Sequence, residues 1–278
     1  MVAAARPRLC YEAAMTARYW KDLTTEDFSG LDAARTVALL PVAAIEQHGP
    51  HLPLGTDAAI NTGVLARAVE LAPMELPLLV LPLLPVGLSP EHGDFPGTLT
   101  LSASTLLSLV TETAEGVARA GLRKLILFNS HGGQPQALEM VAQDLRARHA
   151  MAVIVANSWK LMRPGEFFPP AEREAGIHSG AIETSLLLHL QPGLVRRDKV
   201  GNFPAAPRGY ERDHPELAAG GRFHFAWQAQ DLNPAGAVGD ARLASAEAGQ
   251  AMVEQAAHGL VGLAADLARL PLDILKQR

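Results

Sequence analysis

Apolar runs of strand length alternate with helix-like segments along most of this chain. The strand-like runs occupy residues 37–45, 78–86, 124–128 and 151–157. Apolar residues at helical spacing recur over residues 57–71, 102–121, 134–148, 181–190 and 241–270. This alternation predicts an α/β fold in which a mostly parallel sheet is covered by helices on both faces.

Three stretches interrupt this alternation. Residues 163–176 are rich in Pro, Gly and Glu, which predicts an excursion over the surface that can act as a lid. Residues 200–221 show little periodicity, and residues 223–229 predict one further strand. We see neither an internal repeat nor a change in composition that would mark a second domain.

Length and composition limit the classes of protein to which this chain can belong. A chain of 278 residues with 48% hydrophobic content can form one large domain over residues 1–278. The net charge of -5 shows no basic stripe, so nucleic acid is not an expected partner. The single Cys10 excludes an internal disulfide framework, and no apolar stretch reaches the roughly 20 residues that span a bilayer. We therefore expect a soluble, cytoplasmic protein with no membrane partner.

An acid and an imidazole follow the first apolar run. Glu46 and His48 come directly after residues 37–45, and Asp57 follows a little further on. If the run is a buried strand, Glu46 and His48 project to the same side of its carboxyl end. Open α/β sheets usually bind ligands at that edge. The pair can therefore hold an ion, although a hydrogen-bonded structural pair fits the same pattern equally well.

A second imidazole stands at the end of the strand-like run at residues 124–128. His131 precedes Gly132 and Gly133, which let the backbone and a ligand approach closely. A glycine turn with an incidental histidine is the structural alternative. The polar loop at residues 89–98 either lines a pocket or lies on the surface without a functional role.

His178 and Glu183 flank the start of the predicted helix at residues 181–190. On a regular helix these positions lie well apart, so they converge more easily if His178 belongs to the preceding loop. A carboxylate in the first turn can also simply interact with the helix dipole, which is the structural alternative for Glu183.

Together these places supply three carboxylates and two imidazoles: Glu46, His48, Asp57, His131 and Glu183. This ligand set suits Zn or Mn, and its many oxygens favour two ions that share one carboxylate. Such a pair of ions can generate hydroxide near neutral pH and polarise a carbonyl, which is the chemistry of hydrolysis. The chain has no Cys-x-x-Cys, His-Glu-x-x-His, G-x-G-x-x-G or Walker motif for other common metal or nucleotide sites.

Four motifs occur in one order across residues 35–250. They are Glu46-Gln-His48-Gly-Pro-His51-Leu-Pro with Asp57, Glu91-His92-x-x-Phe95-Pro-Gly-Thr98, His131-Gly-Gly133, and His178-x-Gly-x-x-Glu183-Thr-Ser185. A glycine-rich stretch at residues 233–240 completes the series. In this order the motifs resemble the creatininase (creatinine amidohydrolase) family.

The resemblance implies a three-layer α/β/α sandwich and a dinuclear metal centre that hydrolyses C–N bonds outside ordinary peptides. It also implies a homo-oligomer, commonly a hexamer. Carried over by position, Glu46 and His131 bind one divalent ion, His48 binds the other, and Asp57 bridges them. Zn, Mn and Fe suit these ligands similarly, so the sequence does not identify the metals.

The fifth ligand departs from creatininase itself, which has a Glu two residues after the strand-end His, where this chain has Gly133. Glu183 is the nearest replacement, as in relatives that carry His-Gly-Gly. Those relatives usually have a Glu where this chain has Ala181, a change that affects proton transfer more than metal binding. The resemblance makes Glu183 a catalytic ligand, and we expect His178 to protonate the departing nitrogen.

The resemblance also indicates a small-molecule amide substrate, such as a cyclic amide or formamide. Creatininase has a Trp where this chain has Glu174, so creatinine itself is not favoured. Trp159 can supply an aromatic wall or be a core or interface residue, and Ser89, His92 and His178 are candidates for substrate contact. The alternatives are a peptidase that trims a small precursor peptide, as in the mycofactocin system, and a non-catalytic metal-binding scaffold, for which Ala181 is the only hint.

Overall fold

The computed structural model describes residues 18–205 and 226–276. Its central sheet has four parallel strands in the order β2-β1-β3-β4. They are β1 (Val37–Val42), β2 (Leu78–Val80), β3 (Lys124–Asn129) and β4 (Ala152–Asn157). The register pairs the ends of the central strands at one level, Val42 beside Asn129 and Asn129 beside Asn157. The carboxyl ends of β1, β3 and β4 therefore form one edge.

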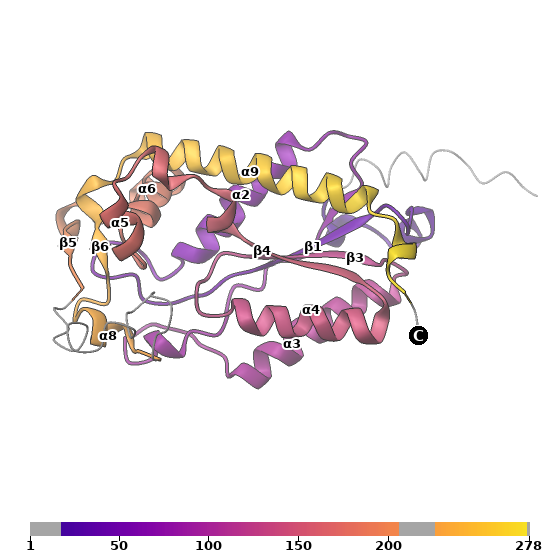
Figure 1. The fold of residues 1–278 in the computed structure, drawn as a ribbon, viewed down its shortest axis with the longest axis horizontal. Coiled ribbons are helices and arrows are strands. Elements are labelled where there is room, and N and C mark those ends of the chain that lie inside the picture. The colour runs from indigo at the N-terminus through magenta and orange to yellow at the C-terminus, as the bar shows by residue number, and fades with distance from the viewer. Residues whose placement is uncertain (1–17, 206–225, 277–278) are drawn as a thin grey trace, which may run out of the picture.

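Helices cover both faces of this sheet (Figure 1). The main helices are α2 (Thr56–Leu71), α3 (Ala103–Arg119), α4 (Pro135–His149), α6 (Ala181–Leu190) and α9 (Ala246–Arg269). Within β1, Val37 and Leu39 pack toward α2, α6 and α9, whereas Ala38 and Leu40 pack toward α3 and α4. Alternating side chains thus feed two apolar layers. The predicted three-layer α/β/α sandwich is confirmed.

Local signals explain where the helices begin. The Ser102 hydroxyl accepts a hydrogen bond from the Thr105 N–H at 3.2 Å, and the Ser245 hydroxyl accepts one from the Ala248 N–H at 3.1 Å. Pro135 occupies the first turn of α4, where no N–H is needed. The structure confirms the predicted helices at all five places, although α9 begins at Ala246 after a short 3₁₀ turn, Ala241–Leu243.

Three strand predictions differ from the structure. The run at residues 37–45 forms a strand only as far as Val42. The run at residues 78–86 forms a strand only as far as Val80, because Pro82 and Pro85 cannot donate to a sheet ladder. Leu84 keeps a single bridge to Val42. Of the predicted strand at residues 223–229, the first three residues lie outside the described ranges. Residues 226–228 form no strand, and α8 (Ala229–Leu232) begins at Ala229.

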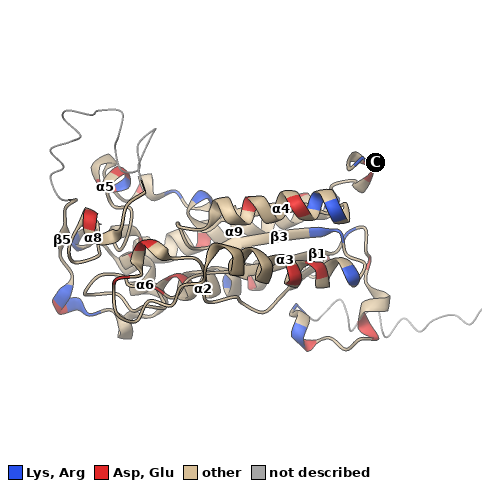
Figure 2. Ribbon diagram, turned by 90° about the horizontal axis from the view of Figure 1, so that it is seen from below, with Lys and Arg blue, Asp and Glu red and all other residues tan. Residues whose placement is uncertain are grey.

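Short elements gather beyond the carboxyl edge of the sheet (Figure 1). They are α5 (Pro170–Ala175), α8 and a two-stranded antiparallel sheet of β5 (Asn202–Phe203) and β6 (Gly239–Asp240). In the view of Figure 2, acidic and basic residues are interspersed over the outer helices. None of the helices in the described ranges combines the length and apolar character that crossing a bilayer requires.

Candidate metal centre

The five residues of the predicted ligand set converge at the carboxyl edge of the sheet, and we call them the ligand cluster. They come from four segments: the loop after β1, the first turn of α2, the end of β3 and the first turn of α6. Four of them are buried, and the Glu183 side chain is 24% exposed. The cluster is therefore accessible from the side of Glu183.

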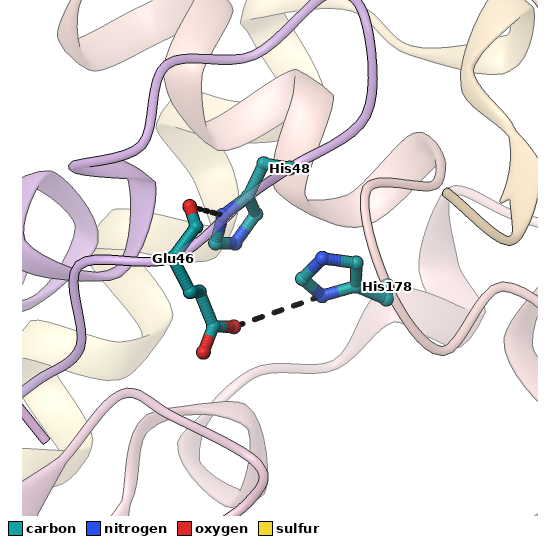
Figure 3. Close-up of side chains that lie close together, drawn as sticks. All are labelled: Glu46, His48 and His178. Atoms are coloured by element: carbon teal, nitrogen blue, oxygen red, sulfur yellow. Dashed lines mark hydrogen bonds and ion pairs between the residues drawn. The ribbon is translucent and has the colours of Figure 1, made fainter. Parts of the chain in front are cut away.

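Glu46 and His48 reach the cluster by a different route from the one the strand pattern predicts. Because β1 ends at Val42, both residues lie in the following loop, where the Glu46 N–H donates to the Leu54 carbonyl at 3.0 Å. The His48 Nδ1 lies 3.0 Å from the Glu46 carbonyl oxygen, which accepts its N–H (Figure 3). With its proton on Nδ1, the His48 ring presents the lone pair of Nε2 to the cluster.

Asp57 lies between two imidazoles. Its Oδ1 is 3.5 Å from His48 Nε2, and its Oδ2 is 3.2 Å from His131 Nδ1. Glu46 Oε2 lies 3.2 Å from the same His131 nitrogen, and Glu183 Oε2 lies 3.9 Å from His48 Nε2. The cluster thus divides into two groups, each with one imidazole and two carboxylates, which share Asp57.

Three atoms that face this space, Glu46 Oε2, His48 Nε2 and Asp57 Oδ2, are buried and make no hydrogen bond within the described part of the chain. Buried polar atoms are normally paired, so unpaired donors and acceptors in one place need a physical reason. All three are good ligands for a divalent ion. The donor set and its orphaned atoms therefore fit a metal centre.

Burial and charge act against each other in the cluster. Burial disfavours the charged ring, yet the nearby carboxylates of Asp57, Glu183 and Glu46 raise the pKa of His48 to about 9. The pKa of His131 is also raised well above its ordinary value, because Glu46 and Asp57 outweigh its burial. The pKa values of Glu46 and Asp57 are lowered despite burial, since both carboxylates face imidazoles. The cluster is built to stabilise cations.

A network around Gln47 surrounds the cluster. The two N–H groups of the Gln47 amide donate to His92 Nδ1 at 2.7 Å and to the Gly236 carbonyl at 2.8 Å. The Gln47 backbone carbonyl accepts the Nε2–H of His178 at 2.8 Å. His178 Nδ1 consequently carries a lone pair and lies 3.9 Å from Glu46 Oε1 (Figure 3). Burial, then the charge of His48, lowers the pKa of His178, which favours this neutral ring.

Of the predicted substrate contacts, Ser89 and His92 lie against the ligand cluster, whereas Trp159 is exposed. Ser89 and His92 are buried against ligand residues: Ser89 Oγ is 3.3 Å from His131 Nε2, and His92 Nε2 is 3.5 Å from Glu46 Oε1. The His92 ring also stacks on His178, with centroids 4.4 Å apart. Trp159 is 39% exposed on the 3₁₀ turn after β4. These contacts tie Ser89 and His92 to the cluster itself, and a substrate role for Trp159 stays a prediction.

Two carboxylates were given no role from the sequence, the partly buried Glu91 and the buried Glu172. Glu91 Oε1 lies 3.5 Å from His131 Nε2, although only its place beside His92 hinted at a role. Glu172, on α5, accepts hydrogen bonds from the backbone N–H groups of Ala181 and Asp240, both at 2.7 Å. No sequence signal singled out Glu172, because its partners lie in distant segments. It connects α5 to the start of α6, which carries Glu183.

Comparison with known proteins identifies the family. The family model described as creatinine amidohydrolase matches residues 21–264 of the chain. The chain belongs to the creatininase family. Among family members, the mycofactocin precursor peptide peptidase of Mycobacterium ulcerans is 32% identical over 235 residues, 82% of this chain and 84% of that protein. The creatinine amidohydrolase of Pseudomonas putida is 30% identical over 202 residues, 66% of this chain and 76% of the relative.

The solved structures agree with this assignment. A structure named "Creatininase Mn" has a TM-score of 0.72 at 26% identity and covers 92% of this chain and 100% of its own. A more distant relative, the 3-dehydro-scyllo-inosose hydrolase of Thermotoga maritima, is 26% identical over 282 residues, 94% of this chain and 85% of the relative. By their names these relatives act on different substrates. Membership therefore indicates hydrolase chemistry and leaves the substrate open.

Proposed function

We propose that this chain is a metal-dependent amidohydrolase that cleaves a C–N bond in a small molecule, such as a cyclic amide or a formamide. The observation that carries the proposal is the position of Asp57, whose two oxygens face two separate imidazoles, His48 and His131. Such a shared carboxylate suits a pair of divalent ions. Relatives in the creatininase family, one of them named for manganese, support the same chemistry.

The proposal assigns three residues of the ligand cluster to each of two ions. Glu46, Asp57 and His131 would hold one ion, and His48, Asp57 and Glu183 would hold the other. When bound, divalent ions of this kind polarise a carbonyl and make water a better nucleophile. Glu183 is the most exposed ligand, so substrate would enter on its side. A homo-oligomeric state remains a prediction from the family.

His178 is the proposed proton carrier. Its Nε2–H is held by the Gln47 carbonyl, so Nδ1 is the atom that can exchange a proton with the reacting groups. Nδ1 faces Glu46 at the edge of the ligand cluster. A proton taken up at Nδ1 could be passed to the departing nitrogen, which avoids expelling an amide anion. The Gln47 contact fixes the ring orientation that this transfer needs.

A peptidase is the second candidate function. The relative from Mycobacterium ulcerans that is 32% identical over 82% of the chain is named for trimming a precursor peptide. Hydrolysis of a peptide bond and of a small amide uses the same attack on a carbonyl, so the ligand cluster suits both. The residues around the cluster, rather than the cluster, would decide between these substrates.

A substrate screen tests the proposal. Purified protein is stripped of metal, reloaded with Mn or Zn, and assayed against cyclic amides, formamides and short peptides. We expect turnover of a small amide by the reloaded protein, loss of turnover in Glu183→Gln, and no change in Glu247→Gln. Glu247 is a matched control because it is an exposed glutamate in the first turn of α9.

The other outcomes are informative. Cleavage of peptides alone would favour the second candidate. A reloaded protein that is inert toward every class would favour a non-catalytic scaffold, and full activity with full metal content in Glu183→Gln would remove Glu183 from the ligand cluster.

A further inference from the structure

The two nitrogens of His131 face different surroundings. Nδ1 faces the carboxylates of Glu46 and Asp57, each at 3.2 Å. Nε2 faces three oxygens: the Leu88 carbonyl at 2.9 Å, Ser89 Oγ at 3.3 Å and Glu91 Oε1 at 3.5 Å. The carbonyl and the carboxylates around both nitrogens can only accept, so Nε2 would keep its proton when Nδ1 gives its lone pair to an ion. In the neutral ring the lone pair is then on Nδ1, directed at the ligand cluster.

Glu91 can approach His131 only because residue 133 is glycine. A Cβ at Gly133 would lie 2.0 Å from Glu91 Oε1 and 2.5 Å from His131 Nε2. No side chain fits there without moving the carboxylate or the ring. The Glu91 side chain is only 16% exposed, so this acid is held inside the protein next to an imidazole. Its placement depends on one contact between two distant segments, the loop before α3 and the turn after β3.

We propose that Glu91 is a positioning residue for the ion held by Glu46, Asp57 and His131. It would act on the Nε2–H of His131 together with the Leu88 carbonyl, which lies closer to that nitrogen. This inference rests on the metal centre of the proposed function. Carboxylates that accept from the second nitrogen of a metal-binding histidine orient the ring and raise its basicity, and their loss typically weakens metal affinity about 10–100-fold. Glu91 also lies close enough to Glu46 and His131 to share an ion with them. The positioning role is proposed because Glu91 approaches Nε2, whereas Glu46 and Asp57 face Nδ1, and counting the bound ions separates the two roles.

Metal affinity tests this role without relying on activity. Metal-free full-length protein is titrated with Zn or Mn in competition with a chelator, and the number of bound ions is counted at saturation. In Glu91→Gln, which keeps the size and removes the charge, we expect one of two affinities to fall about 10–100-fold. Two ions should still bind at saturation, and the other affinity should not change.

Two further variants sharpen the test. Gly133→Ala, which displaces the Glu91 carboxylate or the His131 ring beside it, should weaken the same affinity. Asp94→Asn is the matched control: it removes one charge from an exposed acid on the same loop and should leave both affinities unchanged. The thermal unfolding temperature of metal-free Glu91→Gln should equal that of the metal-free parent. A purely structural role for Glu91 would instead lower that temperature.

The results distinguish a failure of the proposed metal centre from a failure of the role given to Glu91. A parent protein that binds no ion would overturn the metal centre and the role of Glu91 with it. If the parent binds two ions and Glu91→Gln binds them with the same affinities, only the Glu91 inference is wrong. A drop to one ion at saturation in Glu91→Gln would make Glu91 a direct ligand, which also overturns the positioning role.

Discussion

The carboxylate of Glu172 caps the start of helix α6 by accepting the N–H of Ala181 at 2.7 Å. Its second oxygen accepts the Asp240 N–H at the same distance, so one side chain joins α5, α6 and β6. A Cβ at Gly180 would lie 2.5 Å from this carboxylate, so the backbone closes tightly around it. An anion at a helix N-terminus is favoured by the exposed N–H groups and the helix dipole.

Glu172→Gln should destabilise the protein and reduce turnover. Glutamine has one acceptor oxygen, so its NH₂ group would face a backbone N–H, and a buried unsatisfied donor costs roughly 1–3 kcal/mol. Urea unfolding measures the loss, and metal content should be retained. The unfolding free energy of Glu174→Gln, on the exposed side of the same helix, should equal that of the parent. Equal stability of the two variants would show that the cap contributes nothing.

Asp57→Asn should remove metal binding. Asn offers one oxygen where both oxygens of Asp57 face imidazoles, and it lacks the negative charge that two cations require. We expect bound metal, counted by elemental analysis, to fall below one ion per chain and turnover to fall at least about 100-fold. Asp266→Asn, at an exposed position on α9, serves as the control. Two ions retained in Asp57→Asn would contradict the bridging role.

His178→Ala should keep its metal and lose turnover. All five members of the ligand cluster remain in this variant, although His178 also lies close enough to Glu46 and His48 to share an ion with them. Losing a proton carrier typically costs about 10²–10⁴-fold in rate. Parallel measurements of metal content and kcat make the distinction, with His258→Ala on the exposed face of α9 as control. Loss of an ion would instead require a ligand role for His178.

His51 should make stability depend on pH. Its ring is buried, lies 2.9 Å from Thr184 Oγ1 and stacks on Phe203 with centroids 5.3 Å apart. Burial, followed by the charge of His48, lowers its pKa to about 4, below the value of the unfolded chain. The unfolded chain therefore binds a proton that the folded protein does not, so stability falls as the pH drops from about 6.5 toward 4.

The variant His51→Phe keeps an aromatic ring and cannot titrate. Between about pH 7 and pH 5 the parent should lose roughly 2 kcal/mol more unfolding free energy than this variant. Urea unfolding at both pH values gives the difference directly, and other titrating groups cancel in the comparison. Equal losses in the two proteins would mean that the His51 ring accepts a proton without cost.

The elements with local signals were predictable from sequence. Helix α6 occupies the predicted residues because Gly180 precedes it and Pro192 follows its end. The strand at residues 124–128 was predicted with an error of one residue, since an unbroken apolar run allows no other element there. The prediction for residues 78–86 overlooked its two prolines and was too long.

Relations between distant segments were harder to predict. The ligand cluster could be proposed because each member stands at an element boundary in a motif of the family. The contact of Glu91 with Gly133 and the cap of Glu172 on Ala181 depend on tertiary distances, which residue spacing does not encode. The burial of Ser89 and His92 was not predictable for the same reason. The sequence does not distinguish a polar loop residue that faces solvent from one that packs against another loop.

The amide of Gln47 restricts how proteins of this architecture can diverge. Its backbone and side chain bond to Thr98, His92, His178 and Gly236, so four loops meet at one residue. A substitution in any of these loops must therefore preserve the loop's bond to Gln47. New substrate preferences would then arise in the outer rim, at the exposed positions of residues 163–176, whereas the buried Glu172 of that segment stays tied to α6.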